Sequence, residues 1–146
     1  GKQPWTVIRV TVYESLKGDI PAGEQTIYAY GGYISEFDNL GEDSMRAHGE
    51  YASEEEFLRD KAEKQNSILH ITFDGSKPPE AGKEYLFYLA GSIDGGVTPE
   101  GSYELFCGEY GQMEVQPDGT FVRKNCETEG EGTTTFTEDQ VREKLQ

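Results

Sequence analysis

The chain of 146 residues has few of the side chains on which metal and thiol chemistry depend. It contains two cysteines, two histidines and no Cys-x-x-Cys pair. Because a structural zinc site needs four ligands, mostly cysteine and histidine, we expect no metal and no other cofactor. The two thiols, Cys107 and Cys126, either form a disulfide in an oxidising compartment or remain unpaired, and the sequence leaves both alternatives open.

Basic residues are also scarce. Thirteen Lys and Arg stand against 28 Asp and Glu, which gives a formal net charge of -15. Proteins bind nucleic acids and anionic lipid surfaces by neutralising phosphates with Lys and Arg, so we expect neither as a partner. No apolar run approaches the ~20 residues that a membrane-spanning helix needs, so we also expect no membrane span.

The motifs of common catalytic sites are missing as well. The sequence has no Gly-x-Ser-x-Gly, no phosphate-binding loop and no dinucleotide-binding motif. Three consecutive acids, Glu54 to Glu56, lie at a predicted helix start, where the helix dipole favours anions. His70 lies inside a predicted strand and is expected to be half-buried rather than to act as a base. We therefore predict that the protein is not an enzyme.

Short alternating segments dominate the rest of the chain. In the first of them Ile8, Val10 and Val12 share one face while Val7 and Arg9 share the other, which is the period of a strand. Seven such strands are predicted, over residues 5–13, 25–30, 67–73, 85–90, 103–107, 112–116 and 121–124. The segment 85–90 is apolar on both faces, which is typical of a central strand that is covered on both sides.

Two segments interrupt or follow the strands. Residues 36–66 read as an inserted acidic loop, over 36–52, followed by one helix that begins after Ser53. The loop carries carboxylates that could gather around calcium, but their spacing fits no EF-hand. Residues 127–146 read as an exposed tether followed by a C-terminal helix that is capped by Thr137 and Gln140.

These elements predict a mainly β fold in a single domain, residues 1–146. Short strands with Gly-rich corners favour a small antiparallel barrel of the OB-like kind, closed or partly open, with one inserted helix and a C-terminal helix. Closure would remove exposed sheet edges. A β-sandwich is the alternative architecture.

Four segments of the chain resemble one family: VIRVTVYESLKGD, QTIYAYGGYI, AGKEYLFYLAGS and GQMEVQPDGTFV. They are similar to small uncharacterised bacterial domains that are exported or lipid-anchored. Their plan also resembles the netrin-like module of tissue metalloproteinase inhibitors, which is an OB-type barrel. The resemblance implies a secreted or cell-surface barrel and names no activity. Those inhibitors chelate their target's zinc through an N-terminal cysteine, and this chain has no cysteine before Cys107.

The chain begins with Gly1-Lys2-Gln3-Pro4-Trp5, close to its first predicted strand, and shows no export signal. This abrupt start is typical of a trimmed sequence, so we expect that an export signal preceded it.

Aromatic residues give the one candidate surface. Tyr28 and Tyr30 share a face of the second predicted strand, and Tyr33 follows just beyond it. Flat rings on a sheet surface can stack on sugars or hold a peptide. The competing interpretation is that the inserted helix, through Phe57 and Leu58, covers these rings.

The sequence thus favours a non-catalytic binding or interaction domain, secreted or lipid-anchored on the extracytoplasmic side, with a protein or glycan partner at the cell envelope. Two alternatives stay open. One is a secreted protease inhibitor that presents a loop at the barrel rim. The other is a hydrolase that uses carboxylates of residues 36–56, which would require two of them to converge with one desolvated.

Overall fold

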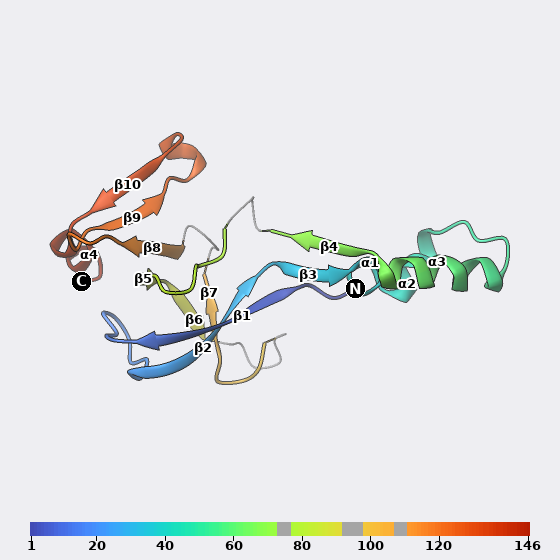
Figure 1. Ribbon diagram of the computed structural model, residues 1–146, viewed down its shortest axis with the longest axis horizontal. Coiled ribbons are helices and arrows are strands. Elements are labelled where there is room, and N and C mark those ends of the chain that lie inside the picture. The colour runs from blue at the N-terminus through green and yellow to red at the C-terminus, as the bar shows by residue number, and fades with distance from the viewer. Residues whose placement is uncertain (73–76, 92–97, 107–110) are drawn as a thin grey trace. The chain divides into compact units, whose positions relative to one another are not determined.

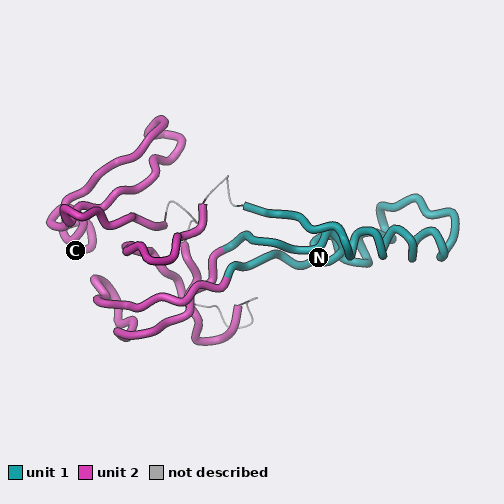
Figure 2. Tube along the Cα trace, in the orientation of Figure 1, with its two compact units in different colours: residues 1–6, 30–74 teal, residues 7–29, 75–146 magenta. Residues whose placement is uncertain are grey.

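The computed structural model describes residues 1–72, 77–91, 98–106 and 111–146 (Figure 1). Over these residues the fold is mainly β, with ten strands and four α-helices. Contacts divide the chain into two compact units (Figure 2). Unit 1 comprises residues 1–6 and 30–74, and unit 2 comprises residues 7–29 and 75–146. The predicted insertion, residues 36–66, lies in unit 1, and the prediction of a single domain stays a prediction.

One sheet is built around β2 in the order β1-β2-β7-β6. Its strands are β1 (Trp5–Val12), β2 (Gly23–Tyr30), β6 (Leu89–Gly91) and β7 (Tyr103–Leu105). The predicted alternation is confirmed: Val10 is half-buried and Arg9 is exposed, while Ile27 and Ala29 on β2 are buried. The expectation of a purely antiparallel fold is wrong, because β2 pairs with β7 in parallel, with Ile27 opposite Tyr103.

A second sheet, in the order β10-β9-β8-β5, is antiparallel throughout. Its strands are β5 (Tyr85–Phe87), β8 (Gln112–Val115), β9 (Phe121–Lys124) and β10 (Thr133–Phe136). The predicted hairpin between β8 and β9 is confirmed. In its turn the Asp118 carboxylate accepts a bond from the Thr120 N–H at 3.0 Å, and Gly119 takes a positive φ of 82° that favours glycine.

The tether predicted after residue 127 is interrupted by structure. A short 3-10 helix, η2 (Glu127–Glu129), comes first, and β10 then pairs with β9 over its whole length. The β-branched run Thr133-Thr134-Thr135 has the propensity for a strand. The prediction of a tether is therefore wrong for residues 133–136, which form a paired strand.

The apolar segment 85–90 contributes to both sheets. Residues 85–87 pair with β8, and residues 89–91 pair with β7. Between them the Tyr88 N–H donates to the Gly111 carbonyl at 2.7 Å, and the Phe106 N–H donates to the Tyr88 carbonyl at 2.9 Å. Leu86 and Phe87 are half-buried. The predicted central strand is therefore one strand that passes from one sheet to the other.

Unit 1 combines a two-stranded ribbon with three helices. The ribbon consists of β3 (Gly32–Ser35) and β4 (Ile68–Ile71), and the helices are α1 (Glu36–Leu40), α2 (Glu42–His48) and α3 (Glu54–Asn66). The prediction of a loop with one helix over 36–66 is corrected, because residues 36–48 are largely helical. The Ser35 hydroxyl caps α1 by accepting a bond from the Asp38 N–H at 3.0 Å.

Both predicted helix starts are confirmed. At α3 the Ser53 hydroxyl accepts a bond from the Glu56 N–H at 3.2 Å. At α4 (Glu138–Lys144) Thr137 and Gln140 form a complete capping box. The described strands lie in three separate sheets and none of these closes on itself, so the predicted closed barrel is not confirmed.

Candidate functional site

The structure places the three predicted tyrosines in different environments. Tyr28 lies in unit 2, half-buried and opposite Glu104 of β7. Tyr30 is half-buried in unit 1, with its ring edge-on to Trp5 at a centroid distance of 5.8 Å. Tyr33 is 74% exposed. Of the three tyrosines, only Tyr33 has a ring that is largely exposed to solvent.

His70 is the residue that joins Tyr33. The two lie directly opposite each other on β3 and β4, and their rings stack with centroids 4.5 Å apart and planes inclined by 15°. His70 is exposed, which corrects the expectation of a half-buried strand residue. Helix α3 does not cover the pair: Phe57 packs edge-on against Tyr51, and Leu58 is 52% exposed.

The backbone of the ribbon fixes this pairing. The Glu36 N–H donates to the Ser67 carbonyl at 2.7 Å, so alternate pairs along the register exchange hydrogen bonds and the Tyr33–His70 pair does not. Side chains approach most closely at such a non-hydrogen-bonded pair, which explains the close stacking. Gly31 allows the turn into β3, because a Cβ there would lie 2.8 Å from the Ile71 carbonyl oxygen.

The same register gives β4 an open edge. The N–H and C=O groups of Ile68 and His70 point away from β3. Within the described ranges β4 pairs with β3 only. Ile68 is 62% exposed and lies on the same face as Tyr33 and His70. We call these three side chains, together with the outer edge of β4, the ribbon face.

Several carboxylates of residues 36–56 are held by basic partners. Arg46 binds Glu54 through two hydrogen bonds of 2.9 Å and Glu42 at 3.0 Å, beside a hollow of about 330 Å³ that is also lined by Tyr51 and Phe57. Bonds from Arg46 lower the pKa of Glu54, and bonds from Lys61 and then Arg46 lower the pKa of Glu42. A general acid needs a raised pKa, so this pair gives the hydrolase hypothesis no support.

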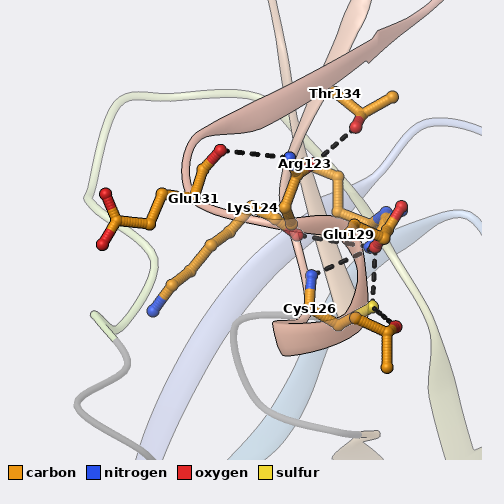
Figure 3. Close-up of polar contacts among 8 residues, drawn as sticks. Arg123, Lys124, Cys126, Glu129, Glu131 and Thr134 are labelled. Carbon is orange, nitrogen blue, oxygen red and sulfur yellow. Dashed lines mark hydrogen bonds and ion pairs between the residues drawn. The ribbon is translucent and has the colours of Figure 1, made fainter.

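A group of hydrogen-bonded polar side chains surrounds Cys126, just after the end of β9 (Figure 3). The Cys126 thiol donates to Glu129 Oε1 at 2.7 Å, and Arg123 binds both oxygens of Glu129 at 2.9 Å. Asn125 accepts a bond from the Thr134 hydroxyl of β10. The group closes the loop between β9 and β10. Cys126 carries a free thiol in this structure, and Cys107 lies outside the described residues. The two alternatives for these cysteines, a disulfide or two unpaired thiols, therefore both stay predictions.

The hydrogen bonds to Glu129 in this group predict that the fold loses stability in acid. Hydrogen bonds from Arg123, and then from Cys126, lower the pKa of Glu129 from 4.5 to about 2. A folded-state pKa below the unfolded one stabilises the fold above pH 4.5, and that contribution is lost as the pH falls toward 2. We expect the Glu129→Gln variant to show a shallower decline of unfolding free energy over this window than the wild type, measured by urea titration at several pH values.

The matched control for this experiment is Glu127→Gln, a change at an exposed residue of the same turn. It should keep the acid decline close to that of the wild type. An unchanged decline in Glu129→Gln would contradict the role given to the Arg123–Glu129 bonds.

Two kinds of feature are absent from the described part of the chain. No three His, Cys, Asp or Glu side chains there gather closely enough to hold a metal ion. No helix there is long and apolar enough to cross a membrane.

Comparison with known proteins gave no relatives: no protein-family model, no curated protein and no solved structure matches the chain.

Proposed function

We propose that the chain is a non-catalytic binding domain of the cell envelope, secreted or lipid-anchored on the extracytoplasmic side, and that the ribbon face binds an extended segment of a protein partner. The observation that carries the proposal is the open edge of β4, where the backbone groups of Ile68 and His70 point away from β3. An added strand would pair with these groups, which is a common mode of peptide recognition.

The side chains beside the edge suit such a partner. Ile68 and Tyr33 are 62% and 74% exposed, although residues of these types usually lose much of their surface in a fold. An added strand would place every second side chain on the same face as Ile68 and His70. The Tyr33 and His70 rings stack on each other, so each has one of its flat faces already covered. The open backbone edge beside these side chains favours a peptide, whose own N–H and C=O groups can pair with β4.

Charge further defines the partner. The described residues of unit 1 hold ten carboxylates and five basic side chains. β4 itself carries no acidic or basic residue other than His70. An acidic segment would be repelled by the surrounding field, whereas a neutral or basic one would be attracted. We therefore propose a neutral or basic partner segment with alternating apolar side chains.

The location and the finer architecture are part of the same proposal. The extracytoplasmic location rests on the resemblance of segments such as VIRVTVYESLKGD to exported bacterial domains. We also propose that unit 2 is a partly open, OB-like barrel similar to the netrin-like module. The passage of residues 85–91 from one sheet to the other supports this, because strands that change sheets form the corners of such folds.

Selection from a displayed library of random ten-residue peptides against the purified chain tests the function. We expect neutral or basic peptides that bind the wild type and lose about tenfold in affinity for His70→Pro, the worth of one or two backbone hydrogen bonds. Proline removes the outward N–H of residue 70 and leaves the bonds to β3, which residues 69 and 71 make. Tyr33→Ala should weaken the same peptides.

Two further variants make the outcome decisive. Ile68→Lys keeps the backbone and places a charge on the edge, and it should also weaken binding by tenfold or more. Leu58→Ala changes an exposed side chain of α3 and should leave affinity unchanged. Peptides that bind His70→Pro and Ile68→Lys as tightly as the wild type would overturn the proposal. Binding of oligosaccharides that depends on Tyr33 but not on residue 70 would favour a glycan partner instead.

A further inference from the structure

A second concave site lies in unit 2, on one face of the sheet β10-β9-β8-β5. The strand registers place alternate residues of all four strands on this face, with Tyr85 opposite Glu114 and Glu114 opposite Val122. Six side chains of this face line a hollow of about 170 Å³: Tyr85, Gln112, Glu114, Val122, Lys124 and Thr133. We call it the sheet hollow.

Residues 77–80 form one wall of the sheet hollow. Two bonds hold this segment against the sheet. The Glu80 N–H donates to the Tyr85 hydroxyl at 3.0 Å, and the Gln112 side-chain amide donates to the Lys77 carbonyl at 3.3 Å. The second bond is long for an N–H···O bond, so it is the weaker attachment of the two.

The buried side chain of Gln112 has an oxygen atom without a hydrogen bond. Gln112 is 9% exposed, and its Nε2 donates to the Lys77 carbonyl. Its Oε1 atom has no hydrogen-bond partner among the described residues. A buried carbonyl oxygen without a donor loses its hydrogen bonds to water and gains none in return, so such atoms are rare in folded proteins. A ligand in the sheet hollow that donates a hydrogen bond to this atom would recover the lost free energy. Because Oε1 is buried, the long Gln112–Lys77 bond is the contact that would open to admit such a ligand.

The rest of the lining restricts the ligand. Two carboxylates, Glu80 and Glu114, and two ammonium groups, Lys77 and Lys124, line the sheet hollow. Both carboxylates also bind Lys83 Nζ, at 3.2 and 3.4 Å, so the lining has no excess negative charge that would favour a cation. Inorganic anions such as phosphate bring mainly acceptors and would leave Gln112 Oε1 unsatisfied. Tyr85 adds an aromatic ring, and it stacks on Phe87 at a centroid distance of 5.4 Å. A neutral ligand with several hydroxyl groups and an apolar face matches this set of groups.

We propose that the sheet hollow binds one sugar residue of a neutral saccharide. A hydroxyl of the sugar donates to Gln112 Oε1, further hydroxyls bond to Glu114 and Lys124, and the apolar face of the sugar ring packs against Tyr85. The volume is below the ~300–1,000 Å³ of sites that enclose a drug-sized ligand, so the hollow holds a single residue and leaves the rest of the chain in solvent. This site is separate from the ribbon face, and its failure would leave the proposed peptide binding intact.

Titration of the ¹⁵N-labelled chain with chitotetraose, maltotetraose and xylotetraose, followed by NMR, tests the proposal. We expect at least one of them to bind with a millimolar dissociation constant and to shift the Gln112 side-chain amide and the Glu114 and Thr133 backbone amides. Gln112→Met keeps the shape of the side chain and removes the unsatisfied oxygen. It should fold at least as stably as the wild type and lose tenfold or more in affinity.

A matched pair of variants on β10 serves as the control. Thr133 lines the sheet hollow, whereas Thr135 is exposed on the same face and lies outside it. Thr133→Val should weaken saccharide binding about threefold, and Thr135→Val should leave it unchanged. The proposal is overturned if all three oligosaccharides leave the Gln112 amide unmoved, if Gln112→Met binds as the wild type does, or if inorganic phosphate shifts these amides while the saccharides do not.

Discussion

Replacing Phe57 with alanine is expected to lower the free energy of unfolding of unit 1 by about 3–5 kcal/mol. Phe57 is 1% exposed and is the largest side chain that unit 1 fully buries among the described residues. Its ring lies edge-on to Tyr51 at 5.2 Å, with the Arg46 guanidinium 3.7 Å from its centroid. The truncation removes both contacts and leaves a cavity that the short helices around it can fill only in part.

Trp5 provides the measurement for this variant. It is the only tryptophan of the chain and lies in unit 1, so urea titration followed by its fluorescence reports the unfolding of that unit. Leu58→Ala is the matched control: it changes the next residue of the same helix, which is 52% exposed, and should cost no more than about 0.5 kcal/mol. Equal and small costs for the two variants would mean that α3 does not pack through Phe57.

Ile27→Ala is expected to destabilise unit 2 by about 2–5 kcal/mol. Ile27 is 0% exposed and lies on β2, between β1 and β7 in its sheet, so its side chain is enclosed by neighbours and the space it leaves cannot be filled by water. Ile27→Val removes a single methylene and should cost about 0.5–1.5 kcal/mol. Urea titration followed by far-ultraviolet circular dichroism measures both.

Val7→Ala is the control for the β2 variants. Val7 lies on the neighbouring strand β1 and is 58% exposed, so its truncation removes an apolar side chain without opening a cavity. A cost well below 1 kcal/mol is expected. If Val7→Ala destabilised the chain as much as Ile27→Ala, the two faces of β1 and β2 would have been assigned the wrong way round.

Local signals in the sequence predicted the elements whose causes are local. The Ser53 and Thr137 caps mark the starts of two helices, and the Pro117-Asp118-Gly119-Thr120 turn marks the β8–β9 hairpin. Helix α1 also has such a signal, because Ser35 is followed three residues later by Asp38. The acidity of residues 36–52 obscured it, since a run of charges without an apolar stripe is also typical of a loop.

Pairings between distant strands could not be predicted in the same way. The parallel pair of β2 and β7 and the division of residues 85–91 between two sheets depend on which segments meet, and the local sequence does not specify this. The candidate site could not be predicted in full for the same reason. The sequence identifies Tyr33 as an aromatic residue beyond a strand, but its partner His70 is 37 positions away and joins it only through the register of β3 with β4.

Nothing in the sequence indicates that the side chain of Gln112 is buried. A glutamine in an alternating strand is expected to face solvent, and the strand periodicity correctly places it on the face opposite Met113. Its burial comes from residues 77–80, which lie across that face. Only the structure could show that a polar side chain of this strand is enclosed.

The composition of β4 also bears on how the chain behaves when concentrated. Natural sheet proteins prevent exposed edge strands from pairing with other molecules by placing lysine, proline or a bulge there. The strand Ile68-Leu69-His70-Ile71 has none of these. Two molecules could therefore join their β4 strands side by side and seed aggregation, with the net charge of -15 as the main force that keeps them apart. Because salt screens that repulsion, the protein should be least soluble at high ionic strength and most soluble when the edge is occupied.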